Sequence, residues 1–184
     1  IGSTVIIVKD NQVVYHKGFG YANEASKKVM PNNAIYRIMS QTKAITSLAI
    51  MQLFELGKIS LDQNVSTIIS SFKNPTVLKD FNSKDSSYTT IPAKRELTIR
   101  DLLTHRSGLG LGAGDLMVFP TINSFTVVDI IHNLRYLKPV SSFRTKYDYD
   151  NLLYIVAGEV IERVSGDTWV DFVEKNIMKP LNMN

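Results

Sequence analysis

The sequence predicts an α+β fold, in which an N-terminal hairpin of an antiparallel sheet precedes a mainly helical domain. Two β-rich runs at residues 4–8 and 13–17 flank a pair of turn-forming residues, Asp10 and Asn11. From Ser40 onward, apolar residues instead recur at three-and-four spacing, which is typical of helices. Because no strand-like run follows these helices, we expect the sheet to be incomplete within this chain.

The first strand of the hairpin has apolar residues on both faces. Val5 and Ile7 point to one side of the strand, while Ile6 and Val8 point to the other. Such a strand is normally covered on both sides, and two strands alone are marginally stable in water. The only further strand-like run nearby is at residues 35–38. The hairpin therefore predicts a larger sheet than this chain supplies.

The strongest helix prediction covers about residues 40–56. Its apolar positions follow helical spacing, and Gly57 stands where a helix end adopts left-handed backbone geometry. A further helix should begin near Asp150 or Asn151 and stop at Gly166 for the same reasons.

Three other helix starts place a hydroxyl three residues ahead of a carboxylate, which is a variant of the capping box. These pairs are Thr98 with Asp101, Thr126 with Asp129, and Thr168 with Asp171. Residues 73–94 are rich in polar side chains with little apolar periodicity, and they are predicted to form a long surface loop. The predicted organisation is therefore the first strands of an α/β domain at residues 1–39, followed by a helical domain at residues 40–184.

The composition excludes several classes of protein. The 184 residues are 44% hydrophobic and 21% charged, which suits a globular domain with a buried core. The net charge of +4 is scattered along the chain, so nucleic-acid binding is not expected. No apolar stretch is long enough to span a bilayer. The chain has no cysteine and its histidines lack ligand spacing, so no metal site is expected.

Ser40 and Lys43 form a candidate nucleophile and base. At i and i+3 on a helix, the hydroxyl and the amine lie on one face, close enough to share a proton. The helix start adds main-chain N–H groups and positive potential, which favour a developing alkoxide. A second pair with this spacing, Ser70 and Lys73, shows that the pattern also arises on ordinary helix surface. Placement separates the two pairs, because Ser40 follows an apolar extended run and opens a long helix.

Tyr149 and Asn151 form a second candidate pair, just before the apolar helix that ends at Gly166. From such a loop, a phenol and an amide could both project into a cleft. Tyr21 and Asn23 repeat the same letters in a predicted loop after the hairpin, so the spacing alone does not select one pair. The order of the motifs along the chain and the elements around them must select the pair.

Five blocks of sequence combine these candidates in one order: residues 18–21 (GFGY), 36–43 (YRIMSQTK), 56–62 (LGKISLD), 98–109 (TIRDLLTHRSGL) and 149–151 (YDN). Together they resemble the serine hydrolase superfamily of class C β-lactamases, low-molecular-weight penicillin-binding proteins (D-Ala-D-Ala peptidases) and related esterases. The similarity covers nearly the whole chain and implies a β-lactamase/transpeptidase-like fold.

By this resemblance, Ser40 would be the acylated nucleophile and Lys43 its proton acceptor. Tyr149 would pass the proton towards the leaving group, and Asn151 would hold the substrate amide and steady Lys43. The main-chain N–H of Ser40 would supply one oxyanion donor. No SDN triplet is present, which favours the tyrosine-dependent arrangement. No cofactor is expected.

The sequence departs from the family pattern just before and within the fifth of these blocks. Phe143 and Arg144 stand where family members usually have Pro-Gly, and Asp150 stands where a small residue is usual. Asp150 would either oppose phenolate formation at Tyr149 or only cap the following helix. His105, at a predicted helix end, is expected to bond main-chain carbonyls there.

A third motif of the family is missing from this chain. It consists of Lys or His, then Ser or Thr, then Gly, on a late strand that supplies a second oxyanion N–H. Residues 106–108 (RSG) and 16–18 (HKG) come close in letters, but both precede Tyr149. Losing one oxyanion donor costs about a hundredfold to a thousandfold in turnover. We therefore expect the 184-residue piece alone to be weakly active or inactive.

The sequence predicts part of a serine hydrolase that acts through an acyl-enzyme on amide, β-lactam or ester bonds of a small-molecule or peptide substrate. Two alternatives stay open: a penicillin-recognising or inactive binding module without turnover, and a helical interaction domain. Related proteins often work outside the cytoplasm, so an extracytoplasmic location, periplasmic or secreted, is expected. The chain opens on Ile1, and processing or trimming before this residue is expected. The substrate and the oligomeric state are left open.

Overall fold

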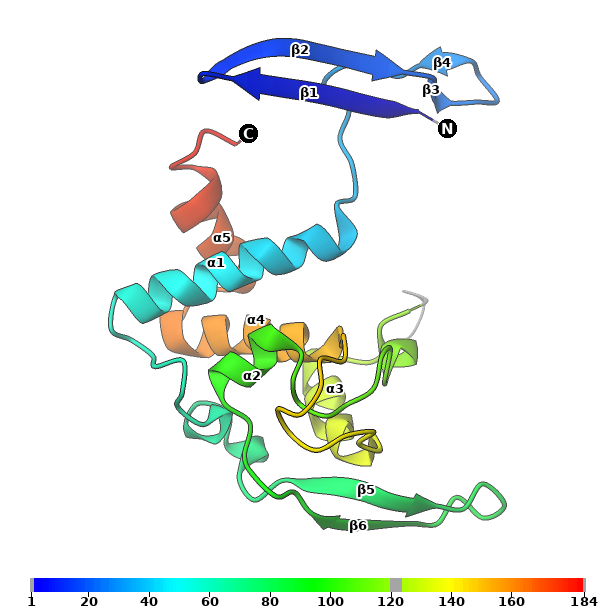
Figure 1. Cartoon of the computed structure of the whole chain (residues 1–184), viewed down its shortest axis with the longest axis vertical. Helices are drawn as coiled ribbons and strands as arrows, with labels where there is room; N and C mark the ends of the chain where they lie inside the picture. The colour runs from blue at the N-terminus through cyan, green and yellow to red at the C-terminus, as the bar shows by residue number, and fades with distance from the viewer. Residues whose placement is uncertain (1, 120–123, 184) are drawn as a thin grey trace. The chain divides into compact units, whose positions relative to one another are not determined.

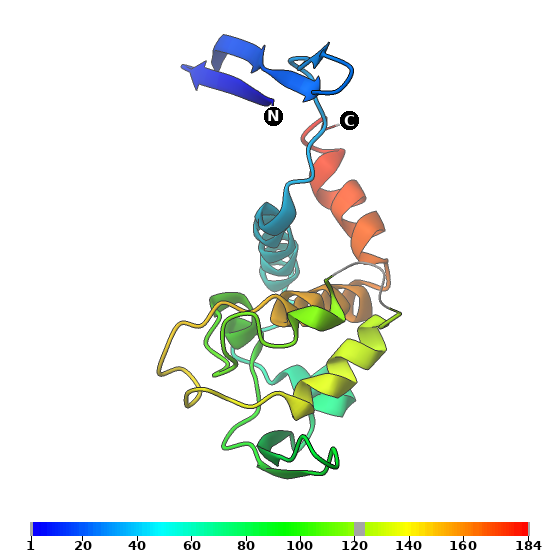
Figure 2. The same ribbon diagram turned by 90° about the vertical axis from the view of Figure 1, so that its right-hand side faces the viewer.

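The computed structural model describes residues 2–119 and 124–183. The chain divides into two compact units, Ile1–Met39 and Ser40–Asn184. Unit 1 is built from strands and unit 2 mainly from helices, and Figures 1 and 2 show the elements of each. The residues proposed for catalysis all lie in unit 2.

Unit 1 contains two small hairpins. Strands β1 (Ser3–Lys9) and β2 (Gln12–Phe19) pair antiparallel, with Lys9 opposite Gln12. The turn between them has positive φ at Asp10 (51°) and Asn11 (59°), as the two-residue turn requires. The predicted hairpin is therefore confirmed. In the described residues its sheet has two strands, and the apolar side chains of both faces of β1 are exposed.

The second hairpin of unit 1 corrects two predictions. Strand β3 (Tyr21–Asn23) pairs with β4 (Lys28–Val29), so the segment from Tyr21 to Asn23 is not a loop. Residues 35–38 do not form a strand. A β-strand needs a partner for its main-chain hydrogen bonds, and no described strand pairs with this run.

A short 3-10 helix, η1 (Met39–Gln41), starts at the last residue of unit 1 and continues directly into α1 (Thr42–Glu55) of unit 2. The predicted helix is confirmed to within two residues at its start. Gly57 has a φ of 67° and ends the helix in the predicted left-handed conformation. Met39, the first residue of η1, also has positive φ (48°).

The remaining helices of unit 2 begin where the sequence places their caps. The capping boxes at Thr98 and Thr126 are both complete, and the Thr168 hydroxyl accepts from the main chain of Asp171. Gly166 ends α4 with a φ of 81°, as predicted. The helices are α2 (Ile99–Thr104), α3 (Val127–Asn133), α4 (Leu152–Ser165) and α5 (Trp169–Val173), with 3-10 helices η2 (Val65–Thr67), η3 (Ser70–Phe72), η4 (Asp115–Met117) and η5 (Leu134–Tyr136), and a π-helical segment η6 (Glu174–Met178).

The segment predicted as a long surface loop is instead a β-hairpin. Strands β5 (Thr76–Phe81) and β6 (Tyr88–Pro92) pair antiparallel within residues 73–94. The prediction was wrong because a register shift between Leu78 and Asp80 interrupts the alternation of apolar residues that would identify a strand. The helical unit thus contains a strand pair that the sequence did not indicate.

Helix α4 is the centre of unit 2. It packs against α1, α2, α3 and α5, and Figures 1 and 2 show these helices around it. Fully buried apolar side chains fill the contact, and burial of each Leu, Ile or Val among them stabilises the fold by roughly 1.5–3 kcal/mol. On α1 and α4 they are Ala49, Ile50, Leu53, Leu152, Leu153, Val156, Ala157, Val160 and Ile161. This packing places the start of α4 beside the start of α1.

Candidate active site

Ser40 and Lys43 lie at the start of α1, on one side of its first turn. Ser40 belongs to η1, and Lys43 follows three residues later in the first turn of α1. The Nζ atom of Lys43 lies 3.2 Å from Ser40 Oγ. The amine and the hydroxyl are therefore in hydrogen-bond contact, as the spacing predicts.

Tyr149 and Asn151 complete a cluster of four side chains. Both residues lie in the segment that leads into α4, and both contact Lys43. Lys43 Nζ is 2.6 Å from Tyr149 Oη and 2.6 Å from Asn151 Oδ1. Tyr149 Oη is in turn 2.6 Å from Ser40 Oγ. The structure thus brings together all four residues that the sequence analysis singled out.

The hydrogen bonds of the cluster can be assigned to individual protons. An ammonium group has three N–H donors, and Lys43 has three oxygen acceptors within reach: those of Ser40, Tyr149 and Asn151. Tyr149 donates its hydroxyl proton to Ser40 Oγ. The phenol therefore links the lysine to the serine, and it is the group through which a proton can pass between them.

The surroundings of Tyr149 favour loss of its proton. Partial burial is the largest influence and opposes ionisation, but the hydrogen bonds with Lys43 and Ser40 and the positive charge of Lys43 outweigh it. The pKa of the Tyr149 phenol is accordingly lowered from its ordinary value of 10.0, although the charge of Asp115 works against this shift. Lys43 Nζ also lies 4.6 Å from the centroid of the Tyr149 ring.

Asp150 caps the helix that follows the Tyr149 and Asn151 pair. Its side chain is fully buried, and Oδ1 accepts from the main-chain N–H groups of Leu152 (2.7 Å) and Leu153 (3.2 Å). The capping interpretation is therefore confirmed. Oδ2 has no hydrogen-bond partner in the described structure. Burial raises the pKa of this carboxyl to about 6, against the effect of the two N–H donors.

His105 has a different role from the one predicted. It ends α2 in the left-handed conformation, with a φ of 55°, and its side chain is buried. The ring was expected to bond main-chain carbonyls, but Nδ1 instead accepts the main-chain N–H of Asp150 at 3.1 Å. The ring stacks on that of Tyr149, with centroids 4.6 Å apart and planes 30° apart. The His105 ring therefore packs against one face of the Tyr149 ring, and sequence spacing gave no signal of this contact.

Burial and the nearby Lys43 charge lower the pKa of His105. The neutral ring is the form that this site favours. It is also the form that the geometry needs, because Nδ1 can accept a hydrogen bond only when it carries no proton.

Asp115 is a further member of the site that the sequence analysis did not single out. It begins η4, and its two carboxylate oxygens accept from Asn151 Nδ2 at 3.0 and 3.1 Å. The Asn151 amide therefore lies between an amine and a carboxylate. One of the two hydrogens on Nδ2 is held by Asp115, and the second remains for the substrate contact that the resemblance implies.

The alternative matches to the two short motifs do not form such a site. Ser70 lies in η3 and is exposed, and no hydrogen bond joins its side chain to Lys73 in the described part of the chain. Asn23 accepts from the main chain of Ser26 and so stabilises a local turn. Of the RSG letters, Ser107 is buried, and its hydroxyl accepts from the main chain of Leu109 at 3.2 Å.

Arg144 explains one departure from the family pattern. Its φ of 64° is a conformation that glycine adopts easily, yet its side chain makes a two-point ion pair with Asp101. Nε lies 2.8 Å from Oδ1, and a terminal nitrogen lies 2.8 Å from Oδ2. Burial raises the pKa of Asp101, but hydrogen bonds from Arg144 and Thr98 outweigh it and lower that pKa overall. The guanidinium thus stabilises the cap of α2, which carries His105 at its other end.

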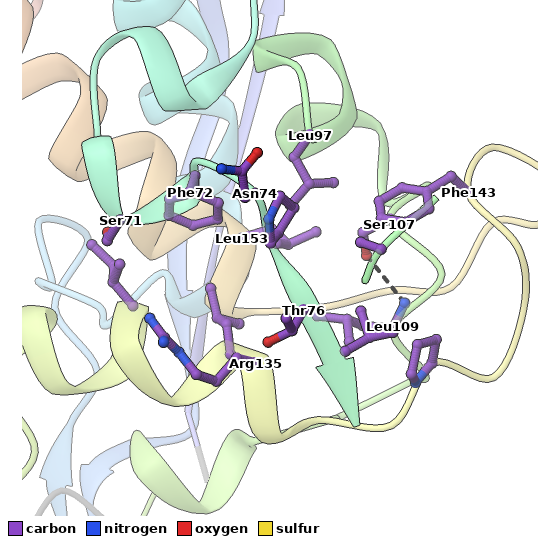
Figure 3. A pocket seen from close by; sticks show the side chains of 16 residues that line it. Ser71, Phe72, Asn74, Thr76, Leu97, Ser107, Leu109, Arg135, Phe143 and Leu153 are labelled. Carbon is purple, nitrogen blue, oxygen red and sulfur yellow. Dashed lines mark hydrogen bonds between the residues drawn. The ribbon is translucent and has the colours of Figure 1, made fainter. Parts of the chain in front are cut away.

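A separate cavity of about 160 Å³ lies among η3, β5 and η5. Its lining is mostly apolar, and Figure 3 shows Phe72, Leu109, Phe143 and Leu153 around it, with Arg135 at one side. None of the four clustered residues lines this cavity. The cavity is therefore distinct from the candidate active site.

Among residues 2–119 and 124–183, no group of three or more His, Cys, Asp or Glu side chains is placed to hold a metal ion. A bilayer-spanning helix is likewise not found in those ranges, since none there combines the required length with sufficient apolarity.

Comparison with known proteins places the whole chain in one group. The family model described as Beta-lactamase matches residues 1–184. Protein flp of Staphylococcus aureus is 27% identical over 188 residues, which is 99% of this chain and 34% of that protein. The chain thus spans about a third of the length of the curated relatives it matches.

Two solved structures share the fold at significant sequence identity. The octameric penicillin-binding protein homologue from Pyrococcus abyssi has a TM-score of 0.77 and 34% identity, over 100% of this chain and 39% of that one. EstCE1, a hydrolase with promiscuous acyltransferase activity, has a TM-score of 0.77 and 25% identity, over 98% of this chain and 46% of that one. The predicted β-lactamase/transpeptidase-like fold is confirmed.

Proposed function

Because this chain belongs to the Beta-lactamase family, we propose that it carries the nucleophile of a serine hydrolase that forms an acyl-enzyme on Ser40. The observation that carries the proposal is the contact of one amine, Lys43, with three oxygen atoms of Ser40, Tyr149 and Asn151. The substrate classes are amides, β-lactams and esters, in a small molecule or a peptide. Its relatives of known structure include both a penicillin-binding protein homologue and a hydrolase with promiscuous acyltransferase activity.

The first step of the proposed reaction is activation of Ser40. Transfer of the Tyr149 proton to a neutral Lys43 gives a phenolate held by an ammonium group, and the hydrogen bond and charge of this ammonium are what lower the pKa of Tyr149. The phenolate then accepts the Ser40 proton over the 2.6 Å contact while Oγ attacks the substrate carbonyl carbon. A bond from Oγ to carbon forms, and the carbonyl electron pair moves to oxygen. The main-chain N–H of Ser40 would stabilise that oxyanion.

The second step is departure of the leaving group. Tyr149 returns the proton to the leaving nitrogen or oxygen as its bond to carbon breaks, which leaves an acyl group on Ser40. A water molecule reverses the sequence: it gives a proton to Tyr149, attacks the acyl carbon, and releases Ser40 with its hydrogen restored. One phenol would therefore serve as base and then as acid in each half of the cycle.

Asn151 has two proposed tasks. Its Oδ1 atom accepts from Lys43 and so holds the amine between Ser40 and Tyr149. Its remaining amide hydrogen can donate to a carbonyl group of the substrate. Each task needs a different end of the amide, so the orientation of this side chain matters for the whole cycle.

The rival proposal is a penicillin-recognising or inactive binding module. It uses the same nucleophile but differs in the fate of the acyl group. The time course of acylation separates the two, because a hydrolase loses the acyl group in turnover and a recognition module keeps it.

The experiment is intact-mass spectrometry of the chain after exposure to penicillin and to a fluorophosphonate. A transient mass increase with penicillin, mapped to Ser40, supports the hydrolase; a persistent one supports the recognition module. Ser40→Ala must remove both adducts, and the exposed Ser70→Ala is the matched control that must keep them. Labelling that survives Ser40→Ala would refute the proposed function. It would also be refuted if neither penicillin nor the fluorophosphonate labelled the chain.

A further inference from the structure

We propose that Asp115 is a positioning residue, which fixes the Asn151 amide with its oxygen towards Lys43. The inference rests on the proposed function, and it assigns a role in the proton-transfer site to a residue that does not contact the reacting serine. The observation is the pair of contacts from Asn151 Nδ2 to Asp115 Oδ1 (3.0 Å) and Oδ2 (3.1 Å).

The carboxylate decides which end of the amide faces which neighbour. An ionised carboxylate can only accept hydrogen bonds, so it requires the NH₂ end of Asn151. The carbonyl end of the amide is then left for Lys43, whose Nζ lies 2.6 Å from Asn151 Oδ1. Without Asp115, the two ends of this nearly symmetric amide would be free to exchange places.

A flipped amide would disable the proposed base. The NH₂ group would then face Lys43, so two donors would meet if the amine were charged. If the amine were neutral, its lone pair would accept the Asn151 hydrogen instead of a proton from Tyr149 or Ser40. The orientation set by Asp115 therefore keeps that lone pair available for catalysis.

The backbone around Asp115 is shaped to hold it at this position. Gly112 and Gly114 have φ values of 70° and 75°, conformations that favour glycine. A Cβ atom on Gly114 would lie 2.5 Å from Leu152 Cδ1, at the start of α4. The N–H of Gly112 also lies 3.4 Å from the carbonyl oxygen of Tyr149. The glycine turn thus packs directly on the segment that carries Tyr149 and Asn151.

The test is a double-mutant cycle on the rate constant for fluorophosphonate labelling of Ser40. Asp115→Ala should slow labelling by about ten- to a hundredfold, the order expected when a catalytic group is misplaced. Asp115→Asn should recover most of this loss, because its carbonyl oxygen can still accept from Asn151. In an Asn151→Ala background, Asp115→Ala should cause less than about a twofold further loss, since two residues that act through one contact are not additive.

Two controls separate positioning from general damage. Asp80→Ala, at an exposed aspartate of β5, should leave the labelling rate within about twofold of the unsubstituted chain. The side-chain NH₂ resonances of Asn151 in an NMR spectrum should shift on Asp115→Ala and not on Asp80→Ala. This readout reports the contact itself and needs no activity.

The outcomes distinguish this inference from the proposed function. If the unsubstituted chain is labelled at Ser40 and Asp115→Ala is labelled at the same rate, the positioning role is wrong. Equal losses from Asp115→Ala with and without Asn151 would also overturn it, because Asp115 would then act by another route. If Ser40 is never labelled in the unsubstituted chain, the proposed function fails. The contact between Asp115 and Asn151 is tested separately: it would be refuted if the Asn151 resonances were unchanged by Asp115→Ala.

Discussion

The phenol oxygen of Tyr149 lies 2.6 Å from the hydroxyl oxygen of Ser40, although 109 positions separate the two residues along the chain. Packing of α4 against α1 accounts for this contact, because Ser40 precedes one helix and Tyr149 precedes the other. The apolar contact of the two helices therefore determines the geometry of the polar cluster at their starts.

Lys43→Met should abolish the activation of Ser40 while keeping most of the side-chain volume. The substitution removes the hydrogen bond and the charge that lower the pKa of Tyr149, so that pKa should rise. We expect fluorophosphonate labelling of Ser40 to slow by at least about a hundredfold, the scale of general acid–base catalysis. Lys73→Met, at the second pair of the same spacing, should leave the rate unchanged. A Lys43→Met chain that labels as fast as the Lys73→Met chain would contradict the assignment of the base.

His105→Asn should misplace Tyr149 without unfolding the chain. Asparagine tolerates the left-handed backbone at this position, and its side chain retains a hydrogen-bond acceptor, but the ring stacked on Tyr149 is lost. Labelling of Ser40 should slow by about ten- to a hundredfold. The circular-dichroism melting temperature should stay within a few degrees. An unchanged labelling rate would show that the stacked ring does not position the phenol.

The unfolding free energy of Asp150→Asn, relative to that of the unsubstituted chain, should increase as the pH rises. The carboxyl has a pKa of about 6 in the folded chain against an ordinary value of 3.8, so the folded state binds the proton more tightly. Stability from this group is present below pH 3.8 and is lost as the pH rises through about 6. Two pKa units correspond to about 3 kcal/mol of unfolding free energy.

Urea unfolding of both chains at pH 4.5 and pH 7.5 measures this effect. The asparagine keeps a cap for α4 and removes the buried charge, so its stability relative to the unsubstituted chain should increase between the two pH values. The opposite trend, or none, would show that Asp150 does not titrate as a buried carboxyl.

Arg144→Ala should lower the unfolding free energy by about 2–4 kcal/mol, because it leaves the buried Asp101 carboxylate without its ion-pair partner. Arg144→Gly removes the same pair but relieves the left-handed backbone, so it should be about 1 kcal/mol more stable than the alanine variant. The pKa of Asp101 is lowered in the folded chain, so its contribution is present above the ordinary value of 3.8 and is lost as the pH falls below it. Urea unfolding at pH 7 compares the three chains, and a second series at pH 3 measures the pH dependence. Equal stabilities of the alanine and glycine variants would contradict the predicted relief of the left-handed backbone.

Local signals in the sequence were sufficient to predict the hairpin turn and the helix ends. Positive φ at Asp10 and Asn11, the capping box at Thr98 and the left-handed Gly166 each depend on residues within one turn of the chain. The β5–β6 hairpin was missed because its bulge hides the period of two that identifies a strand. Where a local pattern is intact, the sequence predicts the element; where a register shift breaks it, the sequence does not.

The site was predictable only in part for a related reason. Ser40, Lys43, Tyr149 and Asn151 were found because short motifs occur in a recognisable order. His105 and Asp115 contact Tyr149 and Asn151 across 44 and 36 positions, and no spacing rule connects residues so far apart. Their roles depend on how the helices pack, so they become visible only in three dimensions.

The rate of Ser40 labelling by a fluorophosphonate in Tyr149→Phe tests the account most directly. The substitution keeps the ring that stacks on His105 and removes the oxygen atom that lies 2.6 Å from Ser40 Oγ. Tyr147→Phe is the matched control, since Tyr147 also contacts the His105 ring but does not bond Ser40 in the described structure. We predict a rate at least about a hundredfold lower for Tyr149→Phe and an unchanged rate for Tyr147→Phe. Equal labelling rates in the two variants would contradict the claim that Tyr149 activates Ser40.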